Sequence, residues 1–190
     1  MITDEDGVNI SQRSITVSTC GLVDKIYDFA NEHMQVTLAV SLHAPNDDIR
    51  KSIMPVANRY SMDEIKKACR YFIEKTGRRV TFEYAMIDGV NDSKECAKEL
   101  VSYTKDLLCH INLIPVNAVK ERKYRRAGAE AIRDFEKYLE AVAKNESDII
   151  PLVNLEAYRI NVTIRKGMGS DIDAACGQLR RQYISKHFDN

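Results

Sequence analysis

Short apolar, β-branched segments alternate with amphipathic segments along most of this chain. The strand-like segments are residues 15–19, 36–42, 79–87, 110–117 and 159–165. The intervening segments place apolar residues at helical spacing, for example Val23, Ile26 and Ala30. Segment 36–42 is almost continuously apolar, as expected for a strand covered on both faces of a parallel sheet. Strands that alternate with helices predict an α/β fold with a mostly parallel sheet.

Local signals predict where several helices begin and end. Ser61 and Glu64 have the spacing of a capping box, and Gly77 suits the end of the helix that they start. Pro55 is expected to stop a short helix that follows the turn at residues 43–48. Another helix is expected to start at residues 91–93. Cys69 and Cys96 fall on the apolar faces of these helices, so both are expected to be structural.

The expected architecture is a partial (β/α) barrel of about five strands with flanking helices. Right-handed crossovers would curl a parallel sheet in this way, although the periodicity does not reveal the strand order. We expect one domain over residues 1–190, with a polar leader at residues 1–12.

Composition narrows the class of protein. No apolar run approaches the length of a membrane span and no signal peptide is evident, so a cytoplasmic protein is expected. A net charge of +0 means that any affinity for nucleic acid must come from a local patch. The 5 cysteines form no CxxC pair and have no zinc or iron–sulfur spacing. The spacing therefore predicts no metal site, and an odd count without a secretory signal indicates reduced thiols in a reducing compartment.

Polar residues follow four of the predicted strands at the end where parallel α/β sheets bind ligands. They are Ser18, Thr19, Ser41, His43, Asn117, Arg165 and Lys166. Each one is also what an ordinary strand-to-loop transition contains. Together they predict a face with few acids that suits a polar neutral or anionic ligand.

His43 and a basic segment each leave two interpretations open. His43 has the chemistry of a general base or metal ligand, but no second ligand lies at suitable spacing, so a structural or substrate-positioning role is favoured. Residues 120–126 carry five cations around Tyr124. That pattern is typical of an RNA-backbone contact with a stacking aromatic, and equally of a solvated charged loop.

The segment DIDAACGQLR, residues 171–180, surrounds Cys176 with small residues. Ala174, Ala175 and Gly177 leave room for another molecule to approach the thiol. A helix start with a buried cysteine is the structural alternative.

This segment resembles the C-terminal signature of the RlmN/Cfr family, radical-SAM methyltransferases that modify C2 of adenine in ribosomal and transfer RNA. ITVSTCG, LAVSLHAPND, GRRVTFEYAMIDGVNDS, CHINLIPVN and NVTIRKGMGSDIDAACGQLR occur in the family's order. The resemblance implies that Cys176 carries the methyl group. It also implies that Ser18, Ser41, Leu42, His43 and Asn117 contact S-adenosylmethionine. In the family, a radical formed at an iron–sulfur cluster then activates the methyl carried on the cysteine.

The chain departs from the family pattern in two ways. The family's CxxxCxxC motif for a 4Fe-4S cluster is absent, so the chain is expected to be the C-terminal part of such an enzyme and inactive alone. Its expected partners are ribosomal or transfer RNA and the missing N-terminal half of the barrel. Residues 144–158 are expected to form an insertion. The rival interpretations are a complete small α/β enzyme that uses Ser41 and His43 as acid and base, and a non-catalytic RNA- or partner-binding fragment.

Overall fold

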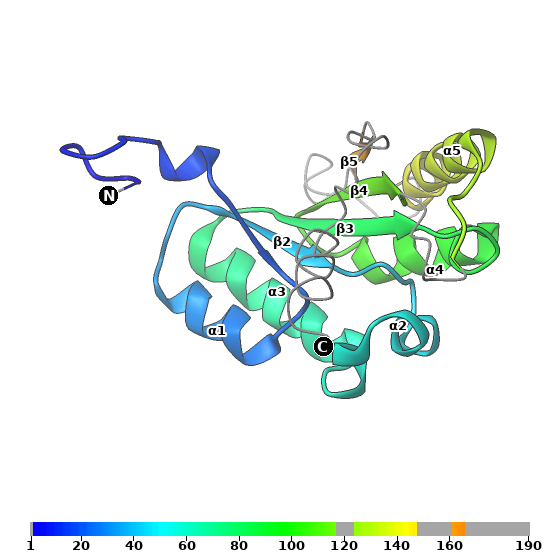
Figure 1. Cartoon of the computed structure of the whole chain (residues 1–190), viewed down its shortest axis with the longest axis horizontal. Coiled ribbons are helices and arrows are strands. Elements are labelled where there is room, and N and C mark those ends of the chain that lie inside the picture. Colours follow the sequence, from blue (N-terminus) through cyan, green and yellow to red (C-terminus); the bar gives the residue numbers. More distant parts are fainter. Residues whose placement is uncertain (1, 117–123, 148–160, 166–190) are drawn as a thin grey trace, which may run out of the picture.

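The computed structural model describes residues 2–116, 124–147 and 161–165 of the chain. In this part of the chain, five parallel strands form one sheet in the order of the sequence (Figure 1). They are β1 (Thr16–Thr19), β2 (Thr37–Ser41), β3 (Val80–Met86), β4 (Cys109–Pro115) and β5 (Asn161–Ile164). The predicted parallel α/β sheet is confirmed. The structure also gives the order of the strands, which the hydrophobic periodicity could not reveal.

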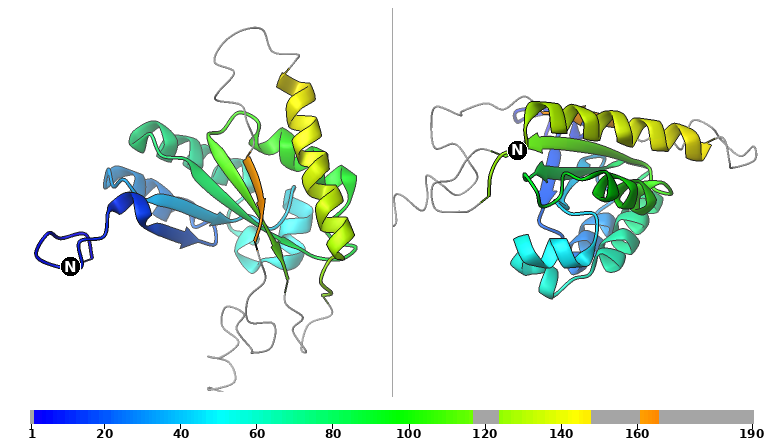
Figure 2. Two further views of the ribbon diagram at one scale, coloured as in Figure 1. Left: turned by 90° about the horizontal axis from the view of Figure 1, so that it is seen from above. Right: turned by 90° about the vertical axis from the view of Figure 1, so that its right-hand side faces the viewer.

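Helices connect the strands. They are α1 (Val23–Asn31), α2 (Asp47–Ile53), α3 (Met62–Thr76), α4 (Lys94–Thr104) and α5 (Ala129–Ser147), with 3₁₀ turns η1 (Gln12–Ser14) and η2 (Pro55–Asn58). Right-handed crossovers between sequential strands bring connecting helices to the same face of a sheet. Figure 1 shows α1, α3 and α4 along one side of the strands, and Figure 2 shows α5 beside β4 and β5. This is the arrangement of a partial (β/α) barrel.

The core lies between the sheet and these helices. Alternate side chains of β3 are buried there, and the ring of Phe82 meets Tyr103 of α4 edge-on while Tyr84 stacks on Phe135 of α5. Burying each such side chain contributes about 1.5–3 kcal/mol. The other β3 side chains are half-buried on the opposite face, which we call the inner face. The two faces of β3 therefore differ: one packs against the helices, and the inner face is available to contact a ligand.

The predicted helix signals are confirmed. Ser61 accepts a hydrogen bond from the Glu64 N–H at 3.3 Å, and the Glu64 carboxylate accepts one from the Ser61 N–H at 2.8 Å. Gly77 ends α3 in the left-handed region at φ 65°. Pro55 follows the end of α2, and Ser93 caps α4.

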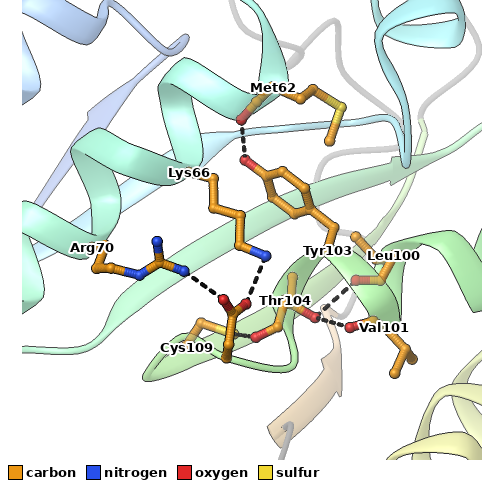
Figure 3. A network of polar contacts seen from close by, with 9 residues as sticks. Met62, Lys66, Arg70, Leu100, Val101, Tyr103, Thr104 and Cys109 are labelled. Atoms are coloured by element: carbon orange, nitrogen blue, oxygen red, sulfur yellow. Dashed lines mark hydrogen bonds and ion pairs between the residues drawn. The ribbon is translucent and has the colours of Figure 1, made fainter.

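An acidic residue in the segment after α4 holds that segment to α3. Asp106 pairs with Lys66 at 2.6 Å and also with Arg70, both on α3 (Figure 3). The Tyr103 hydroxyl donates to the Met62 carbonyl at 2.8 Å. These contacts fix α3 against the segment that leads into β4.

The structure refines two expected boundaries, that of the insertion and that of the leader. Helix α5 continues to Ser147, so the first four residues of the expected insertion at 144–158 extend a helix, because the helical sequence of α5 has no stop signal before them. Residues 148–158 lie outside the described residues. In the leader, the Gln12 side chain accepts a hydrogen bond from the Gln35 N–H at 2.8 Å, which ties its end to the start of β2. No helix of the described part is long and apolar enough to cross a membrane.

Candidate functional site

The carboxyl edge of β1 and β2 presents two of the predicted serines to the inner face. Ser18 lies in register with Ala39, and Ser41 with Glu83, so each shares a face with its neighbour on the next strand. Thr19 behaves differently, because its hydroxyl oxygen accepts hydrogen bonds from the N–H groups of Gly21 and Leu22 at 3.2 and 3.3 Å. Thr19 therefore closes the turn after β1 and faces away from a ligand.

Leu42 belongs to the core. Its side chain is 0% exposed, its N–H donates to the Glu83 carbonyl at 3.0 Å, and its carbonyl accepts from Arg50 at 3.3 Å. Both main-chain groups are thus engaged. Of the SLH triplet, Ser41 and His43 are the residues that can offer polar groups to a ligand.

His43 stands in a left-handed turn at φ 58° immediately after β2. Its N–H donates to the Glu83 carbonyl at 3.1 Å, and its ring Nδ1 accepts from the Ala85 N–H at 3.1 Å. Because Nδ1 is an acceptor, the neutral ring carries its proton on Nε2. Burial, followed by the positive charge of Arg50, lowers the pKa of His43 to about 4. A fixed, neutral Nε2–H donor fits the positioning interpretation and argues against a general base at neutral pH.

Asn91 connects the turns after β2 and β3, a role that the sequence did not reveal. It is fully buried, and its amide donates to the carbonyls of His43 at 2.8 Å and Ala85 at 2.7 Å. Its Oδ1 accepts from the Ile87 N–H at 2.7 Å. The segment DGVNDS predicted only a turn and a helix start, because a buried asparagine and an exposed turn asparagine look alike in sequence.

A chain of hydrogen bonds crosses the inner face below this edge. Asn112 donates to the Glu83 carboxylate at 3.0 Å, Thr163 donates to Asn112 Oδ1 at 3.3 Å, and His110 Nε2 lies 2.9 Å from the Thr163 hydroxyl. Since the hydroxyl proton goes to Asn112, His110 Nε2 is a donor, and every bond points toward Glu83. The expected face with few acids thus contains a carboxylate, next to Ser41.

Glu83 holds its carboxylate in a partly dry setting. Burial raises its pKa, while the hydrogen bond from Asn112 and the charge of Arg165 act in the opposite direction. A carboxylate placed here can accept hydrogen bonds from hydroxyl or ammonium groups, so the inner face combines acceptor and donor chemistry.

The described cysteines include no cluster site. Cys69, Cys96 and Cys109 are buried, which confirms the structural interpretation of Cys69 and Cys96. Burial raises the pKa of the Cys69 and Cys109 thiols to about 12, so both stay protonated and are poor ligands. Cys20 is exposed at the end of β1. Within the described ranges, no three His, Cys, Asp or Glu side chains could together hold a metal ion.

Several predicted residues lie outside the described part of the chain, namely Asn117, Lys166, Cys176 and residues 120–123 of the basic segment. The end of that segment is described. The Tyr124 hydroxyl donates to the Ser52 carbonyl of α2 at 3.3 Å. The backbone of Arg126 pairs with that of Ile87 in an isolated antiparallel β-bridge. Arg125 and Arg126 are exposed. The segment therefore ends on the molecule beside the carboxyl edge, with two cations facing solvent.

Comparison with known proteins covers nearly the whole chain. No family model matches. The chain is 54% identical over 184 residues to the probable dual-specificity RNA methyltransferase RlmN of Lachnospira eligens, covering 97% of the chain and 48% of that relative. It is 53% identical over 184 residues to the protein of the same name from Clostridium novyi, covering 97% and 49%. The chain thus spans about half the length of these curated relatives.

Two solved structures share the fold. A radical SAM methyltransferase from Sphaerobacter thermophilus superposes with a TM-score of 0.80 at 47% identity, over 93% of this chain and 47% of that one. A domain of pyruvate-formate lyase-activating enzyme from Bacteroides vulgatus superposes with a TM-score of 0.54 at 14% identity, over 80% of each chain, which shows the fold alone. The resemblance noted in the sequence is confirmed.

Proposed function

We propose that this chain, which belongs to the RlmN family of radical-SAM RNA methyltransferases, forms the C-terminal half of an enzyme. That enzyme methylates C2 of an adenine in ribosomal or transfer RNA. The observation that carries the proposal is the carboxyl edge, where Ser18, Ser41 and a neutral His43 sit on a fold that matches a radical SAM methyltransferase. Its RNA substrates imply a cytoplasmic protein.

The chemistry of the edge fits the substrate S-adenosylmethionine. That molecule combines hydroxyls, a carboxylate, an ammonium and a sulfonium, and the edge offers serine hydroxyls, the Nε2–H donor of His43 and the Glu83 carboxylate. We assign Ser18, Ser41 and His43 to polar contacts, Leu42 to packing beneath them, and Asn117 to a further polar contact on the strength of its motif. The assignment of Asn117 rests on sequence.

We assign the methyl-carrying role to Cys176 from its motif. The Cys176 thiolate would attack the methyl carbon of the sulfonium with its electron pair, and the carbon–sulfonium bond would break to leave a neutral thioether. Small neighbours at Ala174, Ala175 and Gly177 allow the donor to approach. The buried thiols of Cys69 and Cys109 cannot replace it, because they are protonated and enclosed.

The described residues do not fit an iron–sulfur cluster, because no three of their His, Cys, Asp or Glu side chains come together to hold a metal ion and the thiols of Cys69 and Cys109 are buried and protonated. We propose that the cluster ligands belong to the other half of the protein, and we derive no step of this chain's chemistry through the cluster.

Co-expression tests the proposal. This chain would be produced with the N-terminal half of the Lachnospira eligens relative, and bulk RNA would be digested and analysed by mass spectrometry for 2-methyladenosine. We expect the modified nucleoside from the pair and none from either half. A cluster-loaded complex of the two halves that leaves adenine unmodified would refute the proposed function.

A further inference from the structure

One fully buried cation lies immediately behind the carboxyl edge. Arg50 of α2 is 0% exposed and heads the largest fully buried side chains of the described residues. Burying a guanidinium is costly unless its donors are satisfied, so its presence in the core calls for a purpose.

Arg50 binds main-chain carbonyls of the two turns that carry the predicted ligand contacts. Its Nη2 donates to the Cys20 carbonyl at 2.8 Å and to the Ser41 carbonyl at 3.4 Å. Its Nε donates to the Leu42 carbonyl at 3.3 Å. One planar fork thus joins the turn after β1 to the turn after β2, two residues beyond Ser18 and next to His43. A lysine ammonium has no such fork and would not hold all three carbonyls at once.

Gly21 is shaped by the same guanidinium. A Cβ on Gly21 would lie 2.9 Å from Arg50 Nη2 and 2.9 Å from a methyl carbon of Ile65, and the residue has a φ of 95°. Both the close approach and the positive φ demand glycine. The backbone after β1 therefore runs in contact with Arg50, and the two positions form one unit.

The charge of Arg50 is balanced mainly by carbonyl dipoles. Its hydrogen bonds to the described residues go to main-chain carbonyls, and among those residues its buried Nη1 has no hydrogen-bond partner. Burial lowers the pKa of Arg50, while the nearby Tyr103, Asp47 and Cys20 act against that shift. The guanidinium of Arg50 is therefore held mainly by hydrogen bonds to main-chain carbonyls, and ion pairing contributes less.

We propose that Arg50 is a positioning residue that aligns the turns after β1 and β2, so that Ser18, Ser41 and His43 face the same ligand in register. This inference deepens the proposed function and rests on it where S-adenosylmethionine is concerned. Arg50 itself does not touch the ligand in this account.

The test uses Arg50→Lys and Arg50→Met, with Arg59→Lys as the matched control. Arg59 lies on the segment after η2, its side chain is 72% exposed, and it pairs with Asp24 at 3.5 Å, so its change should alter nothing at the edge. Amide hydrogen exchange on the chain alone reports the turns, and S-adenosylmethionine and RNA dissociation constants are measured on the complex of the two halves.

We expect exchange at Leu42, His43 and Gly21 to accelerate about tenfold in both Arg50 variants, and S-adenosylmethionine to bind about tenfold more weakly, the equivalent of one lost charge-assisted hydrogen bond. RNA affinity should stay unchanged. If the affinities for S-adenosylmethionine and for RNA both fall in proportion to the melting temperature, Arg50 has only a structural role and the inference is overturned. Wild-type exchange rates and affinities in the Arg50 variants would also overturn it.

The two proposals fail separately. If the wild-type complex does not bind S-adenosylmethionine, the proposed function fails, and the exchange measurement still decides whether Arg50 aligns the two turns. If the wild type binds and the Arg50 variants match it in both affinity and exchange, only the inference on Arg50 fails.

Discussion

At the residue scale, the polar side chains of the carboxyl edge bond to main-chain groups. His43, Arg50 and Asn91 together engage carbonyl or N–H groups of the turns after β1, β2 and β3. Such bonds fix backbone positions without bringing a counter-ion into the core. The turns are therefore held by buried hydrogen bonds, which are costly to leave unmade.

The depressed pKa of His43 predicts a specific pH dependence of stability. The unfolded chain takes up a proton on this histidine near pH 6.5, whereas the folded chain resists it until about pH 4. Stability from this group is therefore present above pH 6.5 and lost as pH falls toward 4, by about 3 kcal/mol at pH 4.

Urea unfolding between pH 7.5 and 4 measures this effect. The stability advantage of wild type over His43→Asn should shrink as the pH falls through that window. His33→Asn is the control, since His33 is exposed and also has a positive φ of 52°, which matches the backbone cost. Parallel pH profiles for wild type and His43→Asn would contradict a buried neutral histidine.

Residue burial was predictable only where it follows periodicity. Cys69 and Cys96 were placed in the core from helical spacing, and the structure agrees. Arg50 was not, because a charged residue in a short helix normally faces water. Its burial depends on two turns that meet only in the folded sheet. Glu83 was missed for a related reason: strand alternation fixes its face but not the use of that face.

At the element scale, the alternation of strands and helices predicted every described strand within about two residues, the usual uncertainty of element boundaries. Capping chemistry located the start of α3, since Ser61 and Glu64 satisfy each other locally. The order of the strands in the sheet was not predictable, because the hydrophobic pattern of a parallel strand does not depend on which strands lie beside it. Residues outside the described ranges, including Asn117 and Cys176, remain sequence predictions.

The ion pairs of Asp106 predict how much the link between α3 and the segment before β4 contributes to stability. Burial acts to raise the pKa of Asp106, but the hydrogen bond and charge of Lys66 and the charge of Arg70 lower it overall. Asp106→Asn should therefore destabilise the chain by about 1 kcal/mol at low salt near neutral pH. The difference should vanish as the pH falls below the carboxylate's lowered pKa.

Asp63→Asn is the matched control, because the ion pair of Asp63 with Lys67, at 2.7 Å, lies within α3. Thermal unfolding should show a change of only a few tenths of a kcal/mol for it. Equal effects of the two substitutions would show that Asp106 does not link α3 to the segment before β4.

The basic segment predicts a salt-dependent contribution to RNA binding. Replacing Arg122, Lys123, Arg125 and Arg126 together should flatten the dependence of log K on log salt, because fewer counterions are released. Filter binding of the two-half complex at several salt concentrations measures the slope. An unchanged slope would make the segment a solvated loop, even though Arg125 and Arg126 are exposed beside the edge.

At the scale of the whole molecule, the described sheet has an edge at β1, which pairs only with β2 among the described strands. An open edge favours association, and overall stability is only about 5–15 kcal/mol for a domain. Co-expression with the N-terminal half of a relative should raise the melting temperature and suppress self-association, because that half binds the folded form. Calorimetry and light scattering measure both. A monomeric chain whose melting is indifferent to its partner would contradict this account.

The central claim is that Cys176 carries the methyl group, and a labelled donor tests it most directly. The two-half complex would be incubated with S-adenosylmethionine that bears a deuterated methyl group, then digested and analysed by peptide mass spectrometry. Exposed Cys20 serves as the internal control thiol. We predict a labelled methyl group on the peptide that contains Cys176 and none on Cys20. RNA that becomes methylated by a complex in which Cys176 never takes up the label would contradict the account.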